Sequence, residues 1–395
     1  MAGQTTHPLK IFDLAKDQDR FVYASAPMVR YSKLAFRQTV FTYGVDLCWT
    51  PMVLAKEFNR NQFARDSDFT FASDAPQPPT IVQFGSNSPL EFSRASSLVA
   101  PYVSGVDLNC GCPQSWACAE VLGAALMERR ELVRDMVAEA RSRLRVDGWA
   151  VSLDESKNDP NGKSVSVKIR VHKDLRKTMD FIDTVLGHPQ NRQIDFLTIH
   201  PRTRNTPSSD PINVEALEVL TSKYGNAVPI LVSGDVFTLD TLPFSSPLLT
   251  RAGGHDGAPG KPRSDAEHPS SPRPVLPKLA GLMSARAILA NPALFSNQGA
   301  CSWEVVERFM NKVARAPLPL KLVQHHLTEM TGAGFGPDKR SLLNKKERMA
   351  LIACTNMLDV IDLLDEKMAE KHGGLGLTRS MSVDRYSGRG EEQKE

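Results

Sequence analysis

The feature that most restricts how this chain can fold is an alternation of short apolar runs with amphipathic stretches over its first 300 residues. Several runs are almost continuously apolar, which is typical of parallel strands covered by helices on both faces. Helix-like stretches over 32–43, 89–100 and 213–223 fall between them. Eight strands alternating with helices predict an α/β fold, a (β/α)8 TIM barrel. The eight runs are Phe21–Ser25, Val45–Thr50, Thr80–Phe84, Gly105–Asn109, Val165–Arg170, Asp195–His200, Val228–Ser233 and Leu279–Ser284.

A doubly wound parallel sheet is the competing fold for such a pattern. It normally has fewer strands, with a glycine-rich phosphate-binding turn after the first of them. Here Ala26, Pro27 and Met28 follow the first run, so the pattern favours the barrel.

Two stretches depart from the alternation. In the segment 243–278, 17 of 36 residues are Pro, Gly or Ser, a composition that disfavours regular structure. We predict a disordered insertion there, between the seventh and eighth strands. The polar stretch 152–164 predicts a loop that leads into the fifth strand.

Strand-like runs stop near residue 300, and helical periodicity continues over 303–316, 318–331 and 345–371. This change predicts a second, helical domain. We therefore divide the chain into an N-terminal arm, a barrel that contains the insertion, a helical domain and a disordered tail. The boundaries are 1–20, 21–298, 299–377 and 378–395.

Composition excludes several classes of protein. The net charge of +3 over 395 residues is too small for a histone-like or tail-driven nucleic-acid binder. No apolar run approaches the roughly 18–20 residues that span a bilayer, so we expect no membrane partner. The first 20 residues lack a signal-peptide pattern. We therefore expect an intracellular protein, in the cytoplasm, the nucleus or both, with reduced cysteines.

Polar and reactive side chains lie where several predicted strands end. In a barrel these ends meet at one face, where active sites form. Lys168 and Arg170 share one side of their strand because side chains alternate. Lys168 or His200 alone is as typical of a structural residue as of a site residue, but several at adjacent strand ends favour a site. The residues concerned are Asp107, Asn109, Cys110, Cys112, Lys168, Arg170, His200, Arg202, Asp235 and Arg286.

Among the six cysteines, Cys112 is the candidate for chemistry. We expect at most one of Cys110 and Cys112 to face the mouth of the barrel, and Cys112, next to Gly111 and Pro113 in a turn, is the better candidate. Structural zinc needs four Cys or His ligands, and no fourth partner is evident near these thiols, so we expect no metal. Packing roles are expected for Cys48, Cys118, Cys301 and Cys354.

The basic residues at these strand ends predict a site for an anion. Gly234 lets backbone N–H groups approach a ligand closely, and we expect a short helix to start after Asp235. The step from Ala285 to Arg286 opens another helix, and a phosphate site after the seventh and eighth strands is common in barrels. Gln83 adds an amide that suits the edge of a heterocycle. The expected ligand is a phosphate-bearing cofactor or substrate.

Seven short motifs, taken in order, resemble those of the tRNA-dihydrouridine synthases. They lie in register from residue 21 to about 297, and the helical segment fits the second domain of that family. The resemblance is closest to a eukaryotic branch that acts on the D-loop at the 20a and 20b sites, without an extra zinc or double-stranded-RNA module. The motifs are Ala26-Pro27-Met28-Val29, Gln83-Phe84-Gly85, Asp107-x-Asn109-x-Gly111-Cys112-Pro113, Gly123-Ala124-Ala125-Leu126, Val167-Lys168-Ile169-Arg170, His200-Pro201-Arg202-Thr203 and Gly281-x-Met283-Ser284-Ala285-Arg286.

The resemblance implies an FMN enzyme that NADPH or NADH reduces. The flavin would deliver hydride to C6 of a uracil in tRNA, and Cys112 would protonate C5 as the general acid. Asn109, Arg170 and Arg202 would contact the substrate. The implied FMN-binding residues are Ala26, Pro27, Met28, Gln83, Lys168, His200, Ser233, Gly234, Asp235, Ala285 and Arg286.

One position departs from the pattern of the family. Ser233 stands where the family usually has Asn, which removes one amide near the FMN phosphate, although a Ser hydroxyl can still donate a hydrogen bond. The insertion 243–278 begins a few residues later, close enough to perturb the same loop.

The small net charge conceals a basic window. Between Arg308 and Arg348, nine basic residues face three acidic ones. Within it, Arg308, Lys312 and Arg315 fall at i, i+4 and i+7, which places them on one helical stripe. An ordinary solvated helix face would show the same pattern. With the family resemblance, we predict a tRNA-binding surface here, no DNA partner and a monomer.

Two other functions remain open at this point. An FMN barrel reductase that acts on a free pyrimidine would share the flavin motifs without needing the basic helical domain. An RNA-binding protein without flavin would not need Cys112, Lys168 and His200, and their presence argues against it.

Overall fold

The chain forms two compact units in its computed structural model. The barrel unit comprises residues 1–33 and 45–285, and the helical unit comprises residues 34–44 and 286–395. The second unit therefore begins before the predicted residue 299, and it includes a segment from the N-terminal part of the chain. The structure describes residues 6–71, 78–153, 155–188, 191–251 and 273–372.

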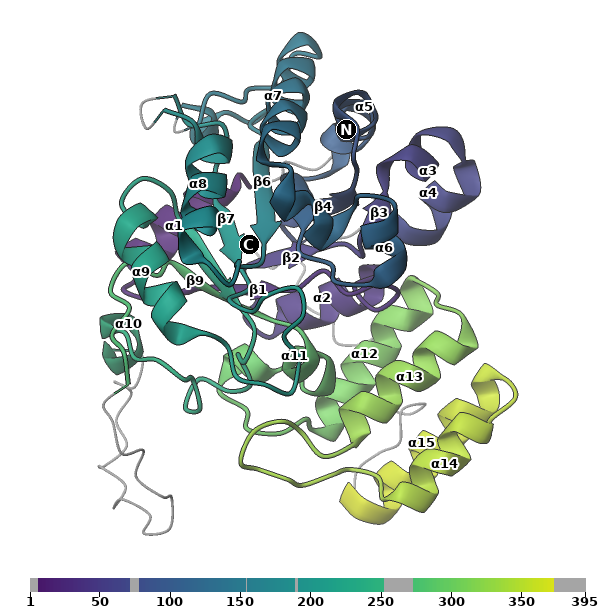
Figure 1. The fold of residues 1–395 in the computed structure, drawn as a ribbon. Helices are drawn as coiled ribbons and strands as arrows, with labels where there is room; N and C mark the ends of the chain where they lie inside the picture. Colours follow the sequence, from purple (N-terminus) through teal and green to yellow (C-terminus); the bar gives the residue numbers. More distant parts are fainter. Residues whose placement is uncertain (1–5, 72–77, 154, 189–190, 252–272, 373–395) are drawn as a thin grey trace, which may run out of the picture. The chain divides into compact units, whose positions relative to one another are not determined.

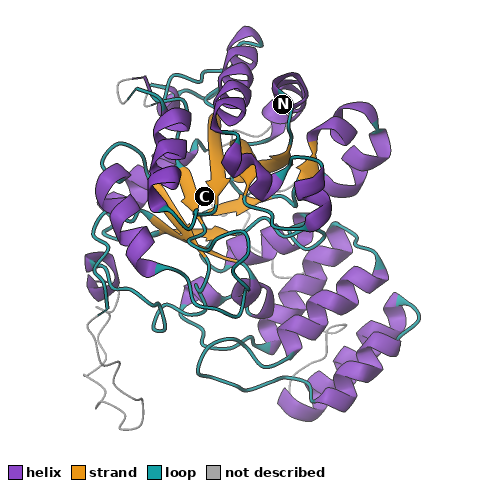
Figure 2. Ribbon diagram, viewed as in Figure 1, coloured by secondary structure: helices purple, strands orange, loops and turns teal. Residues whose placement is uncertain are grey.

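Within the described residues, nine strands form one parallel sheet at the centre of the barrel unit (Figures 1 and 2). They are β1 (Val22–Ser25), β2 (Leu47–Trp49), β3 (Val53–Leu54), β4 (Thr80–Gly85), β5 (Gly105–Cys110), β6 (Ser164–Ile169), β7 (Leu197–Ile199), β8 (Ile230–Ser233) and β9 (Gly281–Ser284). β1 pairs with both β2 and β9, and β2 also pairs with β4, so eight strands close into a barrel. The short β3 adds to the edge of β4. The predicted TIM barrel and all eight predicted strands are confirmed.

Helices surround this sheet. Three of them start at side chains that the sequence places there as N-caps: Ser88, Asp174 and Asn213 each accept a hydrogen bond from the first turn. The helices of the barrel unit are α1 (Pro8–Asp17), α3 (Ala55–Arg60), α4 (Gln62–Asp68), α5 (Pro89–Val99), α6 (Ser115–Ala119), α7 (Arg130–Val146), α8 (Leu175–Leu186), α9 (Val214–Tyr224) and α10 (Pro247–Arg251), with short 3-10 turns η1 (Ala100–Tyr102), η2 (Gly123–Glu128) and η3 (Ser156–Asn158).

The N-terminal segment is a buried helix rather than an arm. Four residues of α1, among them Leu9 and Phe12, belong to the same core cluster as the inward-facing residues of the strands. Phe12 packs on Phe196 with ring centroids 5.6 Å apart. His7 caps α1 by accepting a hydrogen bond from the Leu9 N–H at 3.2 Å. The sequence interpretation missed this element because ten residues give too few helical turns for a clear periodicity.

The described residues of the helical unit form helices joined by loops. They are α2 (Leu34–Thr42), α11 (Arg286–Ala290), the 3-10 turn η5 (Leu294–Ser296), α12 (Trp303–Arg315), α13 (Leu320–Thr331), α14 (Lys345–Ala353) and α15 (Met357–His372). α2 follows β1 in the sequence, yet its buried residues, Phe36 among them, pack with α12. The rings of Phe36 and Phe309 both pack near the His326 ring, with centroids 5.1 and 4.9 Å from it.

The predicted single helix over 345–371 is wrong, because two helices occupy it. Gln324, which is buried, donates its side-chain amide to the carbonyls of Leu351 and Cys354 and so satisfies the end of α14. Asn356 then accepts from the Asp359 N–H and starts α15. The pair Asn356 and Asp359 is a capping signal that the sequence carries.

The insertion 243–278 is ordered at both ends, contrary to the prediction of disorder throughout. Phe244 and Leu276 are buried, and Ser245 forms an isolated β-bridge with Val275. Apolar residues anchor both ends of the segment. The prediction missed them because it considered only the Pro, Gly and Ser content of the whole segment. Its middle, 252–272, and the predicted disordered tail, 378–395, lie outside the described residues. No helix in the described ranges combines the length and apolar character needed to cross a bilayer.

Candidate active site

Three neighbouring strands place polar side chains in one layer inside the barrel. Gln83 on β4, Asp107 on β5 and Ser166 on β6 are register partners. The Gln83 amide donates from Nε2 to Asp107 Oδ2 at 2.7 Å, and the Ser166 hydroxyl donates to Asp107 Oδ1 at 2.7 Å. All three side chains are fully buried. Gln83 therefore lies beneath the open end of the barrel rather than at its surface.

The next layer connects this network to the loop that carries Cys112. Asn109 donates from Nδ2 to Gln83 Oε1 at 2.7 Å. Its own Oδ1 accepts the backbone N–H groups of Gly111 at 3.0 Å and Cys112 at 2.8 Å. Asn109 is buried, while Cys112 is partly exposed. The loop after β5 is thus held from below by a side-chain amide.

Gly123 holds the same loop from its other side. Its φ of +59° and its close approach both require glycine, because a Cβ there would lie 2.5 Å from the carbonyl oxygen of Cys112. The Ala124 N–H donates to that oxygen at 2.8 Å. Cys110 is fully buried, and burial raises the pKa of its thiol well above the ordinary value. Cys110 ends β5, whereas Cys112 lies in the turn beyond it, so Cys112 is the more exposed thiol of the pair.

The other four cysteines differ from the prediction in one respect. Cys48 is buried as expected, whereas Cys118, Cys301 and Cys354 are partly exposed. The Cys118 thiol lies 3.8 Å from the carbonyl oxygen of Cys112, on the one-turn helix that follows it. In the part of the chain that the structure describes, no cluster of three or more His, Cys, Asp or Glu side chains could hold a metal ion.

Two titratable groups in these layers have shifted pKa values. Burial raises the pKa of Asp107 to about 6, although hydrogen bonds from Gln83 and Ser166 and the charge of Lys168 oppose the shift. Burial also lowers the pKa of Lys168 to about 8, and the nearby charge of Arg170 acts in the same direction. Within the described residues the Lys168 amine makes no hydrogen bond. An amine of this kind is available to a ligand.

Arg170 connects two loops at the open end of the barrel. Its Nε donates to the Gly111 carbonyl at 2.8 Å, and its Nη1 donates to the Thr203 carbonyl at 2.7 Å. Burial, with the charge of Arg202 nearby, lowers the pKa of this guanidinium. Its remaining N–H groups are the part that a substrate can use.

The structure turns Arg202 inward, away from the substrate-binding role that the resemblance implies. The side chain is buried, and its Nη1 donates to His200 Nε2 at 3.0 Å. Its Nη2 donates to Asp235 Oδ1 at 2.5 Å, and its Nε donates to the Asp210 carbonyl at 2.8 Å. Because a guanidinium only donates, His200 Nε2 must accept, which places the imidazole proton on Nδ1.

The turn after β8 supports the same imidazole. Gly234 has a φ of +107°, and a Cβ there would lie 2.9 Å from both Cδ2 and Nε2 of His200. The Asp235 carboxylate faces Arg202 and also accepts the Ile212 N–H at 2.8 Å, so its oxygens are used within the protein. The predicted helix after Asp235 is absent, and the next helix, α10, starts at Pro247.

The remaining predicted cofactor residues lie at the ends of β1, β8 and β9. Ala26 and Ser233 are buried, whereas Pro27, Met28 and Ala285 are partly exposed. The loop after β1 is fixed by Ser32, whose hydroxyl donates to the Ala26 carbonyl at 2.8 Å and accepts from the Met28 N–H at 3.0 Å. Arg286 starts α11 in the helical unit, as predicted, and its guanidinium lies 5.6 Å from the Phe335 ring centroid.

A comparison with models of protein families identifies the family of the chain. Residues 24–245, more than half of the chain, match the family model described as dihydrouridine synthase (Dus). The chain belongs to the dihydrouridine synthase family. The resemblance inferred from the seven motifs is confirmed.

Members of this family with similar sequences extend over most of the chain. A protein of Schizosaccharomyces pombe is 34% identical over 93% of this chain and 93% of its own length, and is named tRNA-dihydrouridine(20a/20b) synthase [NAD(P)+]. A Saccharomyces cerevisiae protein with the same name is 31% identical over 94% of this chain and 87% of its own length. A Homo sapiens protein, whose name adds "-like", is 30% identical over 88% and 91%.

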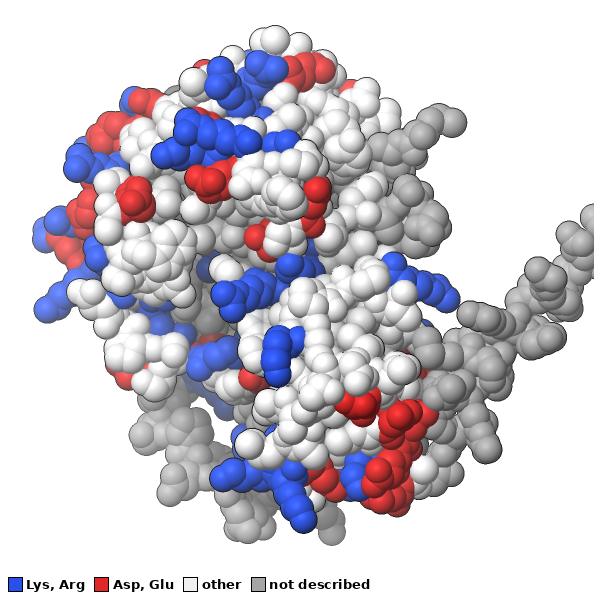
Figure 3. Space-filling view, turned by 90° about the vertical axis from the view of Figure 1, so that its right-hand side faces the viewer, with Lys and Arg blue, Asp and Glu red and all other residues white. Residues whose placement is uncertain are grey.

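In this family member, α12 of the helical unit presents the predicted basic stripe. Arg308 and Arg315 are exposed and Lys312 is partly buried. Burial and the charges of Arg315 and Arg308 lower the pKa of Lys312, which shows that the three cations lie close together. Arg308 also pairs with Glu304 at 3.5 Å. On the face drawn in Figure 3, Lys and Arg side chains form separate groups between neutral and acidic surface.

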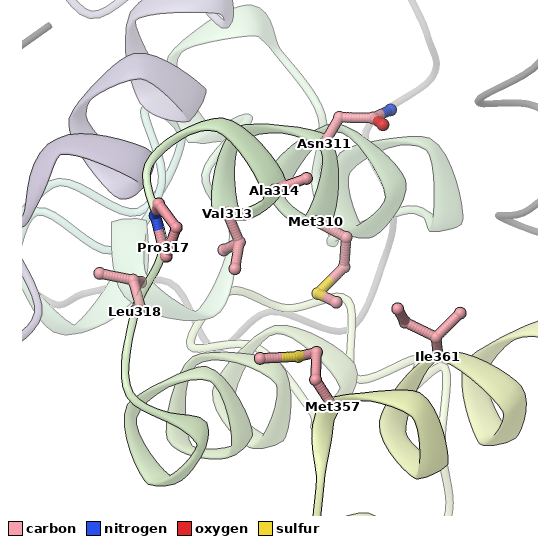
Figure 4. Close-up of a pocket in the computed structure, with 8 residues that line it drawn as sticks. All are labelled: Met310, Asn311, Val313, Ala314, Pro317, Leu318, Met357 and Ile361. Carbon is pink, nitrogen blue, oxygen red and sulfur yellow. The ribbon is translucent and has the colours of Figure 1, made fainter.

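An apolar pocket of about 240 Å³ lies elsewhere in the helical unit (Figure 4). Met310, Met357 and Ile361 face one another across it, while Asn311 points away. It lacks the cationic donors that a phosphate-bearing ligand needs. The strand ends of the barrel remain the better candidate for the active site of this dihydrouridine synthase family member.

Asp107 is the residue of the candidate site that the sequence interpretation left without a role. It follows the motif pattern, but a carboxylate in a strand gives no sign of which neighbours it will bind. The register of β4, β5 and β6 supplies that information, and only the folded sheet fixes the register.

Proposed function

We propose that this protein is an FMN-dependent tRNA-dihydrouridine synthase that reduces a D-loop uridine, at position 20a or 20b. Membership of the dihydrouridine synthase family supports the reaction, and the names of the relatives from the two yeasts support tRNA, these positions and NAD(P). The observation that carries the proposal is the placement of Cys112, Lys168 and His200, all partly exposed, at the ends of β5, β6 and β7.

The donors at these strand ends fit FMN. Lys168 offers an amine without a hydrogen bond in the described residues, and the proton of the His200 imidazole lies on Nδ1. Pro27 and Met28 offer partly exposed apolar surface to an aromatic ring, and Gln83 keeps one amide N–H beyond the one that Asp107 binds. When bound, FMN supplies hydride that originates in NADPH or NADH. Backbone N–H groups at Ser233, Gly234, Asp235 and Ala285, with Arg286, are proposed to hold the phosphate.

Cys112 is proposed to donate the proton to C5 of the uracil. Hydride addition at C6 builds negative charge on C5 and O4, so a nearby acid and cationic donors lower the barrier. The Cys112 thiol is positioned by Asn109 below it and by Gly123 beside it. Arg170, which carries unpaired N–H groups at the same opening, is proposed to contact the base together with Asn109. The uridine must leave its stack in folded tRNA to reach this depth.

The test uses purified protein, NADPH and tRNA from a strain that lacks dihydrouridine at these positions. We expect a yellow protein that forms dihydrouridine, measured by nucleoside mass spectrometry. Cys112→Ala should retain FMN and NADPH oxidation but reduce uridine about 100-fold more slowly, the typical contribution of a general acid. Cys118→Ala, in the helix α6 that follows this loop, is the matched control and should keep the parent rate.

Three results would contradict the proposal. A colourless protein that cannot be reconstituted with FMN excludes a flavoenzyme. Reduction of free uracil or uridine without reduction of tRNA indicates a small-molecule reductase instead. An unchanged rate in Cys112→Ala removes the assignment of the acid while leaving the reaction intact.

A further inference from the structure

Asp107 lies below the candidate site and contacts neither the solvent nor the Cys112 loop. Its carboxylate is fully buried and accepts one hydrogen bond from each neighbouring strand, from Gln83 on β4 and from Ser166 on β6. A buried carboxylate is costly unless it is well hydrogen-bonded, and a strand interior does not require one. The position therefore calls for a functional explanation.

The chemistry of a carboxylate gives the hydrogen bonds a direction. An ionised carboxylate only accepts, so the end of the Gln83 amide that faces Asp107 must be its NH2 group. The carbonyl end of Gln83 then faces Asn109 and must receive a donor, the Asn109 NH2 group. This leaves Asn109 Oδ1 as the atom that faces the loop, where it accepts the N–H groups of Gly111 and Cys112.

We propose that Asp107 is a positioning residue that fixes, through the amides of Gln83 and Asn109, the loop that carries Cys112. The negative charge of Asp107 fixes the orientation of the Gln83 amide. The Gln83 amide then fixes the orientation of the Asn109 amide. If the Gln83 amide were reversed, its NH2 group would face the NH2 group of Asn109, and two donors cannot bind each other. Asn109 would then have to reverse as well. Its NH2 group would face the backbone N–H groups of the loop, which are also donors. The same charge thereby sets the direction of the Gln83 amide beside the proposed flavin site.

The inference deepens the proposed function, yet the chain of hydrogen bonds is a property of the protein without cofactor. Its effect on Cys112 can be measured by thiol alkylation, which needs neither FMN nor tRNA. Cys118 lies in α6, the helix that follows this loop, and is also partly exposed, so it serves as an internal reference in the same molecule.

The experiment compares the full-length parent with Asp107→Leu, Asp107→Asn and Ser166→Ala. Ser166→Ala removes the other donor to the same carboxylate without touching either amide, and is the matched control. The iodoacetamide alkylation rates of Cys112 and Cys118 are measured in the apoprotein by peptide mass spectrometry. FMN affinity is measured separately by quenching of flavin fluorescence.

In Asp107→Leu we expect Cys112 to be alkylated at least about fivefold faster because its loop is released, while Cys118 stays within about twofold of the parent. FMN affinity should fall about tenfold because the Gln83 amide is no longer oriented. Asp107→Asn can present either an oxygen or an NH2 group to Gln83. We therefore expect Cys112 to be alkylated about threefold faster and the FMN affinity to fall about threefold. At pH 8, well above the Asp107 pKa of about 6, Ser166→Ala should match the parent in both measurements.

A ratio of Cys112 to Cys118 alkylation that stays at the parent value in both Asp107 variants overturns the proposal, even if they melt at lower temperature. A purely structural role predicts that result. If Asp107→Leu does not fold, the ratio in Asp107→Asn decides. If the parent binds no FMN, the proposed function fails, while the alkylation ratio still tests the positioning role.

Discussion

At the scale of single residues, the site has two tiers of polar groups. Gln83, Asp107 and Arg202 are buried and bind other protein groups, whereas Cys112 and His200 are partly exposed above them. The buried tier fixes orientation, and the exposed tier lies where a ligand would bind. Substitutions in the two tiers should therefore have different effects.

Gly234→Ala tests the support of His200. A Cβ at Gly234 would lie 2.9 Å from the imidazole, and its φ of +107° is unfavourable for Ala. We expect a loss of roughly 1–3 kcal/mol in the free energy of unfolding, measured with urea, together with weaker FMN binding.

Gly148→Ala is the matched control for this substitution. Gly148 has a φ of +89° but no atom within 4 Å of the added Cβ. Gly148→Ala should lower the free energy of unfolding by roughly 1–2 kcal/mol and keep the FMN affinity of the parent. Equal FMN affinity in the two variants would show that His200 is not held by this contact.

FMN affinity should depend on pH through two groups. Below pH 6, Asp107 becomes protonated and can no longer direct the Gln83 amide. Above pH 8, Lys168 loses its charge, and the affinity should fall by up to about tenfold per pH unit. Fluorescence titrations between pH 5 and pH 9.5 should therefore show a maximum between pH 6 and 8.

Lys168→Met should abolish the alkaline decrease. Lys163 is the matched control because burial also lowers its pKa to about 8, although it precedes β6 and donates to the Val103 carbonyl at 2.8 Å. Lys163→Met should retain the decrease. If the alkaline decrease persists in Lys168→Met, another group is responsible.

The residue types at the strand ends could be predicted from the sequence, but their partners could not. Cys112 and Lys168 are partly exposed as expected, because residues at the end of a barrel strand, or in the turn after it, lie at the open face of the barrel. Arg202 and Asp235 also lie at strand ends, yet they bind each other. That pairing depends on the distance between two loops that are 33 residues apart in the chain, which local patterns do not report.

At the scale of elements, the helix that precedes the barrel is part of its core. α1 contributes Leu9, Ile11, Phe12 and Ala15 to a cluster that includes residues of β1, β2, β4, β8 and β9. Residues at the N-terminal ends of barrel strands stabilise the fold, whereas residues at the C-terminal ends of the strands carry the chemistry. Substitutions in α1 should thus change stability without changing the site.

Phe12→Ala should lower the free energy of unfolding by about 3 kcal/mol or more, because it removes a buried ring that packs on Phe196. Phe63→Ala is the matched control, since that ring is 85% exposed, and it should change the value by less than about 0.5 kcal/mol. Urea denaturation of both variants measures the difference. Similar values would show that α1 is not part of the core.

The stripe on α12 should bind tRNA phosphates. Replacing Arg308, Lys312 and Arg315 by Glu should weaken tRNA binding, with a slope of log affinity against log salt that is smaller by about 3, and should leave FMN content unchanged. Filter binding over a range of salt concentrations measures both quantities.

The matched control replaces three exposed arginines on α7 by Glu. This change alters the net charge by the same amount. Arg134, Arg143 and Arg145 lie on the barrel unit. This variant should bind tRNA more tightly than the α12 variant. Equal weakening would indicate that only the overall charge matters.

Elements with several turns or a long apolar run were the easiest to predict. All eight barrel strands lie within one or two residues of their predicted ends, because buried parallel strands are nearly all apolar. The sequence marks the start of α15 by Asn356 and Asp359, but the end of α14 was missed because it depends on Gln324, which satisfies it from another helix. A tertiary contact of this kind has no local signature.

At the scale of the whole molecule, the two units are interleaved along the chain. α2 belongs to the helical unit although it lies between β1 and β2, and its residues Phe36 and Val40 are fully buried there. The chain therefore enters the helical unit twice. A single cut cannot separate the two units.

Residues 1–285 alone should be poorly soluble, because the apolar face of α2 loses its partners. Size-exclusion chromatography should show aggregates. Co-expression with residues 286–395 as a separate chain should restore solubility, since it supplies α12. A soluble, monomeric 1–285 chain would show that α2 is stable without the helical unit.

The interleaving also has a consequence for synthesis. Residues 34–44 are made about 240 residues before α11 begins, which takes roughly 10–50 s at ordinary translation rates. During that time the strands of the barrel can pair in order, but Phe36 and Val40 have no partner to cover them. The first helix made after β1 is thus among the last to find its place, and in a growing chain its apolar face stays uncovered until α12 has been made.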